Sequence, residues 1–198
     1  MRGPVIVLAT WLIAGCASSD QPHRYFILDG GATRAREPAT TAPSPHGTVL
    51  VAPVTAAGFY GTREIAYSRV AGTRGYYQYS NWTELPAIAI GNALMPKLER
   101  SGRFRMVVHA ASRVDGTLVL RVHLDELYHD AATPPGIARV ALTAQLSDPS
   151  TRALVDRRTF AAAAPAKSYD ADGAVAGLRQ ALDHALDDLV SWVAAAQR

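Results

Sequence analysis

A lone cysteine, Cys16, is the feature that most limits how this chain can fold. With one thiol in 198 residues, no disulfide can form within the chain, so the fold must rest on packing alone. A chain of this size can bury roughly two thirds of the surface that its unfolded state exposes, which is enough for a hydrophobic core.

The segment before Cys16 is typical of a secretory signal peptide. Arg2 is followed by an apolar stretch over residues 5–13 and then by small residues. That stretch is shorter than the ~20 residues that a membrane-spanning helix needs. Residues 12–16 resemble a bacterial lipobox, whose cysteine is acylated, as with palmitate, and becomes the first mature residue. We therefore predict a signal peptide over residues 1–15 and a lipid anchor on Cys16; the alternative is a signal peptide with a chance cysteine.

Residues 16–22 are polar and predict a short tether, followed by a single α+β domain over residues 23–198. No long apolar run follows the signal peptide, so we expect a soluble body on a lipid anchor. The charges are scattered along the chain, which argues against nucleic acid as a partner. Lipoproteins that are retained at the inner membrane typically have Asp directly after the acylated cysteine. In this chain that position is Ala17, so the chain resembles the other class. This resemblance points to the outer membrane, on its periplasmic side.

The sequence of residues 23–198 predicts an α+β fold, with a mostly antiparallel sheet and two main helices packed on it. Residues 23–28 and 48–54 form β-rich runs, and Pro53 sits at the end of the second, which we expect to be central. Residues 34–47 read as a loop. Residues 65–70 and 76–79, joined by a glycine-containing connection, predict a hairpin. Further strands are expected at 104–108, 118–124, 137–146 and 154–162, the last three as an antiparallel meander.

The side chains of two of these strands alternate between apolar and polar residues. Alternation predicts one buried and one exposed face. The residues expected to face inward are Leu118, Leu120, Val122 and Leu124 in one strand and Val140, Leu142, Ala144 and Leu146 in the other.

Two helices complete the predicted fold. The first begins near Thr83, a plausible N-cap, has Pro86 in its first turn and ends before Gly102. Pro96 should kink that helix or end its regular part. The second runs over residues 170–197 with one apolar stripe. The stripe consists of Val175, Leu178, Leu182, Leu186, Leu189 and Val193.

Catalytic motifs are weak throughout the chain. The sequence contains no zinc-type spacing, nucleophile elbow, phosphate loop or dinucleotide fingerprint, so we expect no cofactor and no metal. His123, Asp125 and His129 could form an acid–base or metal site, but a solvated strand face accounts for them better. A second polar group lies on the outer side of the last helix and comprises Asp183, His184, Asp187 and Asp188. The sequence therefore favours a protein that is not an enzyme.

An aromatic segment is the better candidate for a contact surface. Tyrosine and tryptophan suit interfaces because each carries a large apolar area and a polar group. Aromatic side chains on both faces of a hairpin cannot all enter one core, so we expect some of them to be exposed; the alternative is a hairpin packed wholly on the first helix. The candidate contact residues, for a partner or for lipid, are Tyr67, Arg69, Arg74, Tyr76, Tyr77, Tyr79 and Trp82, with Phe59 and Tyr60 just before them.

The order of these features resembles the ABC-type transport auxiliary lipoprotein family, whose members accompany transporters with mammalian-cell-entry (MCE) domain proteins. The resemblance covers essentially the whole mature chain. It rests on the lipobox and, after it, on Tyr25-Phe26-Ile27-Leu28, Val49-Leu50-Val51-Ala52-Pro53-Val54, the Tyr-rich hairpin, Trp82-Thr83-Glu84-Leu85-Pro86, Ser101-Gly102-Arg103-Phe104, Leu118-Val119-Leu120-Arg121-Val122 and Leu189-Val190-Ser191-Trp192-Val193.

The resemblance implies an accessory role without catalysis in lipid transport between two membranes. Implied partners are an MCE-domain protein and an ABC permease and ATPase, with a lipid as a candidate ligand. Two alternatives stay open: a lipoprotein that regulates a cell-wall synthase by direct contact, and a periplasmic hydrolase using His123 and Asp125. The sequence leaves open the cargo, the direction of transport and whether the protein forms a homo-oligomer.

Overall fold

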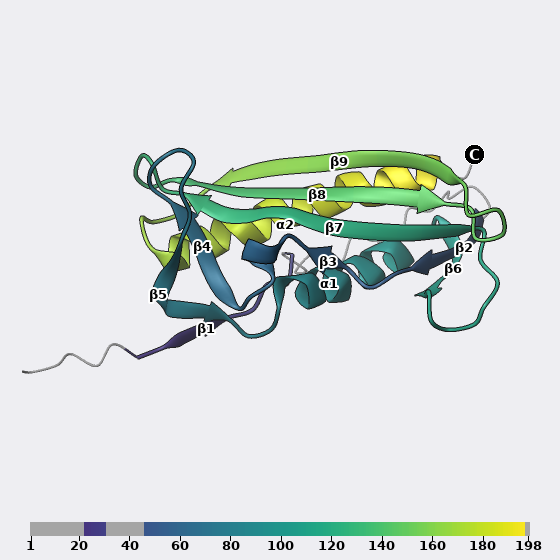
Figure 1. Cartoon of the computed structure of the whole chain (residues 1–198), viewed down its shortest axis with the longest axis horizontal. Helices are drawn as coiled ribbons and strands as arrows, with labels where there is room; N and C mark the ends of the chain where they lie inside the picture. The colour runs from purple at the N-terminus through teal and green to yellow at the C-terminus, as the bar shows by residue number, and fades with distance from the viewer. Residues whose placement is uncertain (1–21, 31–45, 197–198) are drawn as a thin grey trace, which may run out of the picture.

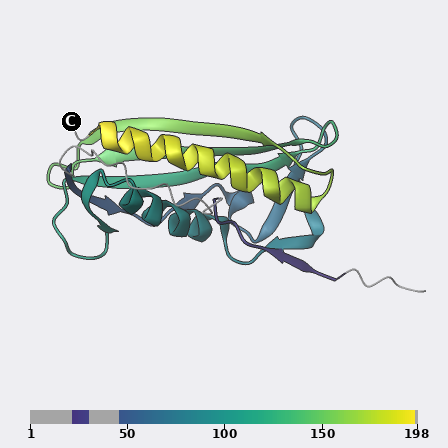
Figure 2. The same cartoon turned by 180° about the vertical axis from the view of Figure 1, so that it is seen from behind.

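Two helices lie side by side on one face of a mixed nine-stranded sheet (Figures 1 and 2). The computed structural model describes residues 22–30 and 46–196. The predicted signal peptide, Cys16, most of the tether and almost all of the expected 34–47 loop lie outside the described residues. The elements are β1 Arg24–Phe26, β2 His46–Val51, β3 Thr55–Ala56, a 3-10 turn at Gly58–Tyr60, β4 Glu64–Ser68, β5 Gly75–Trp82, α1 Pro86–Arg100, β6 Phe104–His109, β7 Leu118–Asp130, β8 Ile137–Ser147, β9 Leu154–Pro165 and α2 Ala171–Ala195.

Strand β7 organises the sheet. Along one edge it pairs with β2, β3 and β4 in turn, and along the other edge it pairs with β8, which pairs with β9. The predicted meander β7–β8–β9 and the predicted hairpin β4–β5 are antiparallel and are confirmed. The expected central strand is β2, which lies between β6 and β7.

The α+β class is confirmed, but the sheet is more mixed than expected. Strands β2, β3 and β4 run parallel to β7, β6 runs parallel to β2, and β1 runs parallel to β5. Side-chain alternation has the same period in parallel and antiparallel strands. The sequence pattern therefore identifies the strands without fixing the direction in which distant ones meet.

Helix α1 differs from its prediction at its start. Leu85 is the N-cap and makes no side-chain capping bond, so the expected cap at Thr83 is wrong. The backbone N–H of Thr83 instead donates to Phe26 O at 2.8 Å. Pro86 occupies the first turn, where a missing N–H costs nothing. The helix continues through Pro96 to Arg100, so Pro96 does not end it, and Gly102 follows with the positive φ of 64° expected of a C-terminal glycine.

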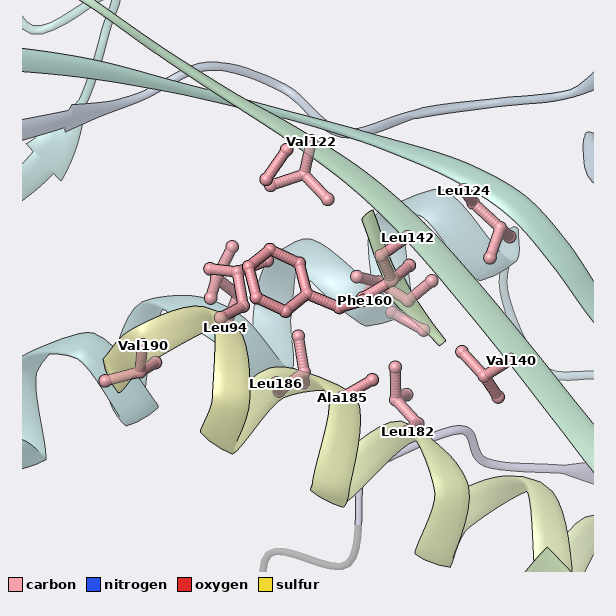
Figure 3. Packing of buried hydrophobic residues seen from close by; sticks show 14 of the residues in the cluster. Leu94, Val122, Leu124, Val140, Leu142, Phe160, Leu182, Ala185, Leu186 and Val190 are labelled. Carbon is pink, nitrogen blue, oxygen red and sulfur yellow. The ribbon is translucent and has the colours of Figure 1, made fainter. Parts of the chain in front are cut away.

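Helix α2 confirms its prediction. The Asp170 side chain caps it by accepting a hydrogen bond from the Gly173 N–H at 2.9 Å. All six residues of the predicted stripe are buried, and they face the buried sides of β7, β8 and β9. Figure 3 shows Leu182, Leu186 and Val190 pointing toward the sheet, with Leu94 of α1 beside them. Every residue predicted to face inward from β7 and β8 is buried as well.

Strand β7 is longer than the predicted 118–124 segment and contains a bulge. Leu124 pairs with Leu142, whereas Glu126 pairs with Ala141, so Asp125 is the extra residue. Beyond the bulge the strand continues to Asp130, and Leu127 and His129 are buried. This extension carries β7 to the end of the molecule where β4 and β5 lie (Figure 1).

Candidate functional site

The candidate contact residues fall on the hairpin β4–β5 and its connection. Ala66 pairs with Tyr76 and Tyr67 with Gly75, but the next pair is Glu64 with Asn81. Strand β5 therefore contains several more residues than β4 over the same length. This irregularity turns the hairpin's aromatic side chains in different directions, and it produces two separate clusters on its two sides.

The first cluster centres on His129, which is fully buried beneath Tyr77 of the hairpin. Tyr77 Oη lies 2.7 Å from His129 Nδ1, and His129 Nε2 lies 2.9 Å from the carbonyl oxygen of Pro135. A carbonyl can only accept, so Nε2 carries the proton and Nδ1 accepts from the Tyr77 hydroxyl. Burial lowers the pKa of His129 and raises the pKa of Tyr77 to about 12. Both groups are therefore neutral near pH 7.

More aromatic rings extend this cluster in both directions. Tyr169, just before α2, meets the His129 ring edge-on at 6.2 Å, and its hydroxyl donates to Ala131 O at 2.7 Å. On the other side Tyr67 lies 5.0 Å from Tyr77, ring centroid to centroid. The guanidinium of Arg69 lies 5.1 Å from the Tyr67 ring centre. The cluster thus joins the hairpin to β7 and to the entrance of α2.

The second cluster centres on Arg74. Its guanidinium carbon lies 3.6 Å from the centre of the Tyr128 ring, and its Nε donates to Tyr60 Oη at 3.2 Å. Glu126 approaches its Nη2 at 3.7 Å. Next to it, Tyr76 stacks on Phe59 with centroids 4.4 Å apart and donates its hydroxyl to Phe59 O at 2.8 Å. Arg74 and Tyr76 are therefore used to hold the hairpin on the body.

Exposure separates the remaining predicted contact residues. Trp82 is 2% exposed and belongs to the hydrophobic core, so its ring has no surface to offer a partner, in contrast to the prediction. Tyr79 is 39% exposed, which agrees with the expectation that some aromatic side chains stay outside the core. The connection between β4 and β5 is accessible to solvent: the Arg69 side chain is exposed and Val70 is 63% exposed. The accessible part of the hairpin is thus its tip and the Tyr79 side.

The residues suspected of catalysis each have a different hydrogen-bond partner. His123 Nδ1 lies 2.8 Å from Thr55 Oγ1, and Thr143 Oγ1 donates to Asp125 Oδ2 at 2.6 Å. His129 is buried in the hairpin cluster. Within residues 22–30 and 46–196, no three His, Cys, Asp or Glu side chains lie close enough to hold a metal ion.

The second polar group, on α2, is engaged by α1. Lys97 Nζ lies 2.6 Å from Asp183 Oδ1 and 2.6 Å from Asp187 Oδ1. These ion pairs cross between the two helices, so the acidic side of α2 helps to fasten α1. Of the two helices in the described part of the chain, neither is long and apolar enough to cross a membrane.

Sequence reasoning missed the partners of the hairpin. His129 lies 52 residues from Tyr77 in the chain, and Tyr169 lies further still. A buried histidine leaves no periodic signal, because it takes the place of an apolar residue on the inner face of β7. The run of tyrosines did mark the region.

Comparison with known proteins identifies the family. Residues 30–190 match the family model described as ABC-type transport auxiliary lipoprotein component. No curated protein matches the chain in sequence.

Solved structures share the fold. A Xanthomonas campestris protein of the DUF330 family is 24% identical, with 80% of this chain and 90% of that one aligned at a TM-score of 0.72. An uncharacterized protein is 14% identical over 87% of this chain and 99% of its own, with a TM-score of 0.67. A hypothetical protein from Chlamydia trachomatis is 10% identical over 75% and 96%, with a TM-score of 0.51. At these identities the similarity establishes the fold alone.

Proposed function

The chain belongs to the family of ABC-type transport auxiliary lipoproteins, and from that premise we propose that it is the docking component of an MCE-linked system that moves lipid between two membranes. The observation that carries the proposal is the family match over residues 30–190, which spans almost the whole predicted body. The component acts by binding and not by catalysis.

The proposed anchor is a lipid on Cys16, which holds the body at the periplasmic side of the outer membrane. Cys16→Ala should leave an unprocessed or soluble precursor, and mass spectrometry of the wild-type protein should find a lipid on Cys16. Ala17→Asp is the matched variant: the anchor stays, but the protein should move to the inner-membrane fraction. An unmodified Cys16 in the wild-type protein would refute the anchor.

The proposed docking surface is the tip of the hairpin, namely Arg69 and Val70, with Tyr67 beside them. Arginine and aromatic side chains dominate the energetic centres of protein interfaces. Arg74, Tyr76 and Tyr77 support this surface from behind, through their contacts with Tyr128, Phe59 and His129. Trp82 is left out because it is buried.

A charge reversal at the tip tests this surface. The double variant Arg69→Glu with Val70→Asp should weaken binding to the MCE-domain protein by about 2 kcal/mol or more, roughly 30-fold in Kd. Both side chains are exposed, so the circular dichroism spectrum should not change. Leu154→Asp, at a 61% exposed apolar residue of β9, is the matched control and should bind normally.

Unchanged binding in the tip variant would place the docking surface elsewhere. Co-purification of the wild-type protein with a cell-wall synthase, and with no transporter component, would favour the regulatory alternative instead.

A further inference from the structure

Strand β1 presents two different faces, which follow the alternation of its side chains. Toward α2, Arg24 forms a bidentate ion pair with Asp172, Phe26 packs against the core and Leu28 is 3% exposed. On the opposite side Tyr25 is 64% and Ile27 is 55% exposed. More than half of each of these two side chains is therefore left uncovered by the described part of the fold.

The neighbouring strand continues this exposed face. Tyr25 pairs with Asn81, whose side-chain amide lies 3.3 Å from His23 Nδ1, and the His23 ring meets the Tyr79 ring edge-on at 5.8 Å. His23, Tyr25, Ile27 and Tyr79 thus form one surface, which we call the β1 face.

The composition of the β1 face suits the boundary between lipid and water. Tyrosine places an apolar ring among acyl chains and its hydroxyl among headgroups, which is why it is enriched at membrane interfaces. Isoleucine adds apolar area to the same face.

The position of the β1 face in the chain identifies what covers it. His23 comes only seven positions after Cys16, a span of about 25 Å when fully extended. The β1 face is therefore the part of the described body that the proposed anchor holds nearest to the bilayer. The fully extended span from Cys16 to Ile27 is about 38 Å. The tether is therefore long enough for the β1 face to lie on the bilayer or away from it, and the affinity of the face decides between the two.

We infer that the β1 face rests on the interfacial layer of the membrane beside the lipid anchor and fixes the orientation of the body. This inference relies on the anchor of the proposed function. With β1 at the bilayer, β9 and the tip of the hairpin β4–β5 both lie on the far side of the molecule (Figures 1 and 2). A fixed orientation would present the tip to a partner in the periplasm.

Fluorescence quenching on vesicles tests the inference with the full lipidated chain. Because acylation consumes the Cys16 thiol, Ile27→Cys supplies one free thiol for a bimane label. The vesicles contain phosphatidylethanolamine and phosphatidylglycerol, with some lipids carrying a nitroxide at the headgroup. We expect strong quenching at position 27 and none for a label on Ala161→Cys, an exposed residue of β9.

Variants of the β1 face test whether the face itself binds the bilayer or is only kept near it by the tether. Tyr25→Asp or Tyr79→Asp should reduce the quenching at position 27 to the level seen at position 161. Leu154→Asp, an equal change at an exposed apolar residue outside the face, should leave the quenching intact. Quenching at position 27 that survives both Asp variants, or that never exceeds the value at position 161, would overturn the inference.

Vesicle flotation of the same samples keeps the two hypotheses apart. If the unlabelled wild-type chain fails to float, the anchor is absent and the proposed function is at fault. If every variant floats while only the β1-face variants lose quenching, the inference holds. If those variants float, keep their quenching and lose the MCE-domain protein, the β1 face is a protein contact and the inference fails.

Discussion

The long-strand body and the hairpin end are built in different ways. In the body, β7 pairs with β8 and β8 with β9 over eleven residues each, and leucines such as Leu142 of β8 and Leu182 of α2 are fully buried between the sheet and the helix. At the hairpin end the strand register is irregular, and aromatic rings are held by directed bonds such as that between Tyr77 and His129. Apolar burial is non-directional and involves no proton, whereas a hydrogen bond depends on the geometry and protonation of single atoms. The hairpin end should therefore be the more sensitive to pH and to single-atom changes.

The largest expected effect is in the body. Leu182→Asp buries an unpaired charge in the α2 stripe and should lower the free energy of unfolding by more than the ~2–5 kcal/mol typical of Leu→Ala. Gln180→Asp is the matched control on the exposed side of the same helix and should cost under ~0.5 kcal/mol. Denaturant titration measures both. Equal stabilities would mean that the stripe is not the centre of the core.

A smaller effect is expected at the hairpin end. Tyr77→Phe removes one oxygen and leaves the buried His129 Nδ1 without its donor, which should cost about 1–3 kcal/mol. Tyr25→Phe, at a 64% exposed ring, removes the same atom and should cost under ~0.5 kcal/mol. A Tyr77→Phe variant as stable as Tyr25→Phe would show that the hydrogen bond contributes nothing and that the two regions are alike.

The smallest effect is a pH dependence confined to the hairpin end. Burial holds the pKa of His129 below its ordinary value of 6.5, so the unfolded chain binds more protons in the window between the two values. The free energy of unfolding should be greatest above pH 6.5 and should fall as the pH drops through the lower pKa of the folded state. The neighbouring carboxyl groups of Asp130 and Asp170 have pKa values lowered from 3.8, so their effects begin at lower pH.

His129→Gln isolates this contribution because glutamine stays polar and does not titrate. Thermal unfolding of both proteins between pH 7.5 and 5, roughly one unit on either side of the ordinary histidine pKa, should show a shallower slope for the variant. Parallel slopes would mean that His129 keeps the same pKa in the folded and unfolded chains. The contrast between the two regions would then lie in geometry and not in charge.

Elements with a regular side-chain period were foreseeable from the sequence. The α2 stripe and the inward residues of β7 and β8 all proved buried, because burying apolar area dominates folding and a period of 2 or 3.6 selects the buried face. The Tyr-rich hairpin was foreseeable for the same reason, since its turn residues and β-prone runs act locally.

Tertiary structure alone decided the rest. The parallel pairing of β2, β3 and β4 with β7, the bulge at Asp125 and the burial of His129 under Tyr77 join segments far apart in the chain. Trp82 is the clearest example of what the sequence could not decide. Tryptophan is a residue type that suits an interface, yet in β5 its side chain points into the core. Residue type and period determine which side chains leave water, but only long-range packing determines which partners they meet and which aromatic rings stay outside.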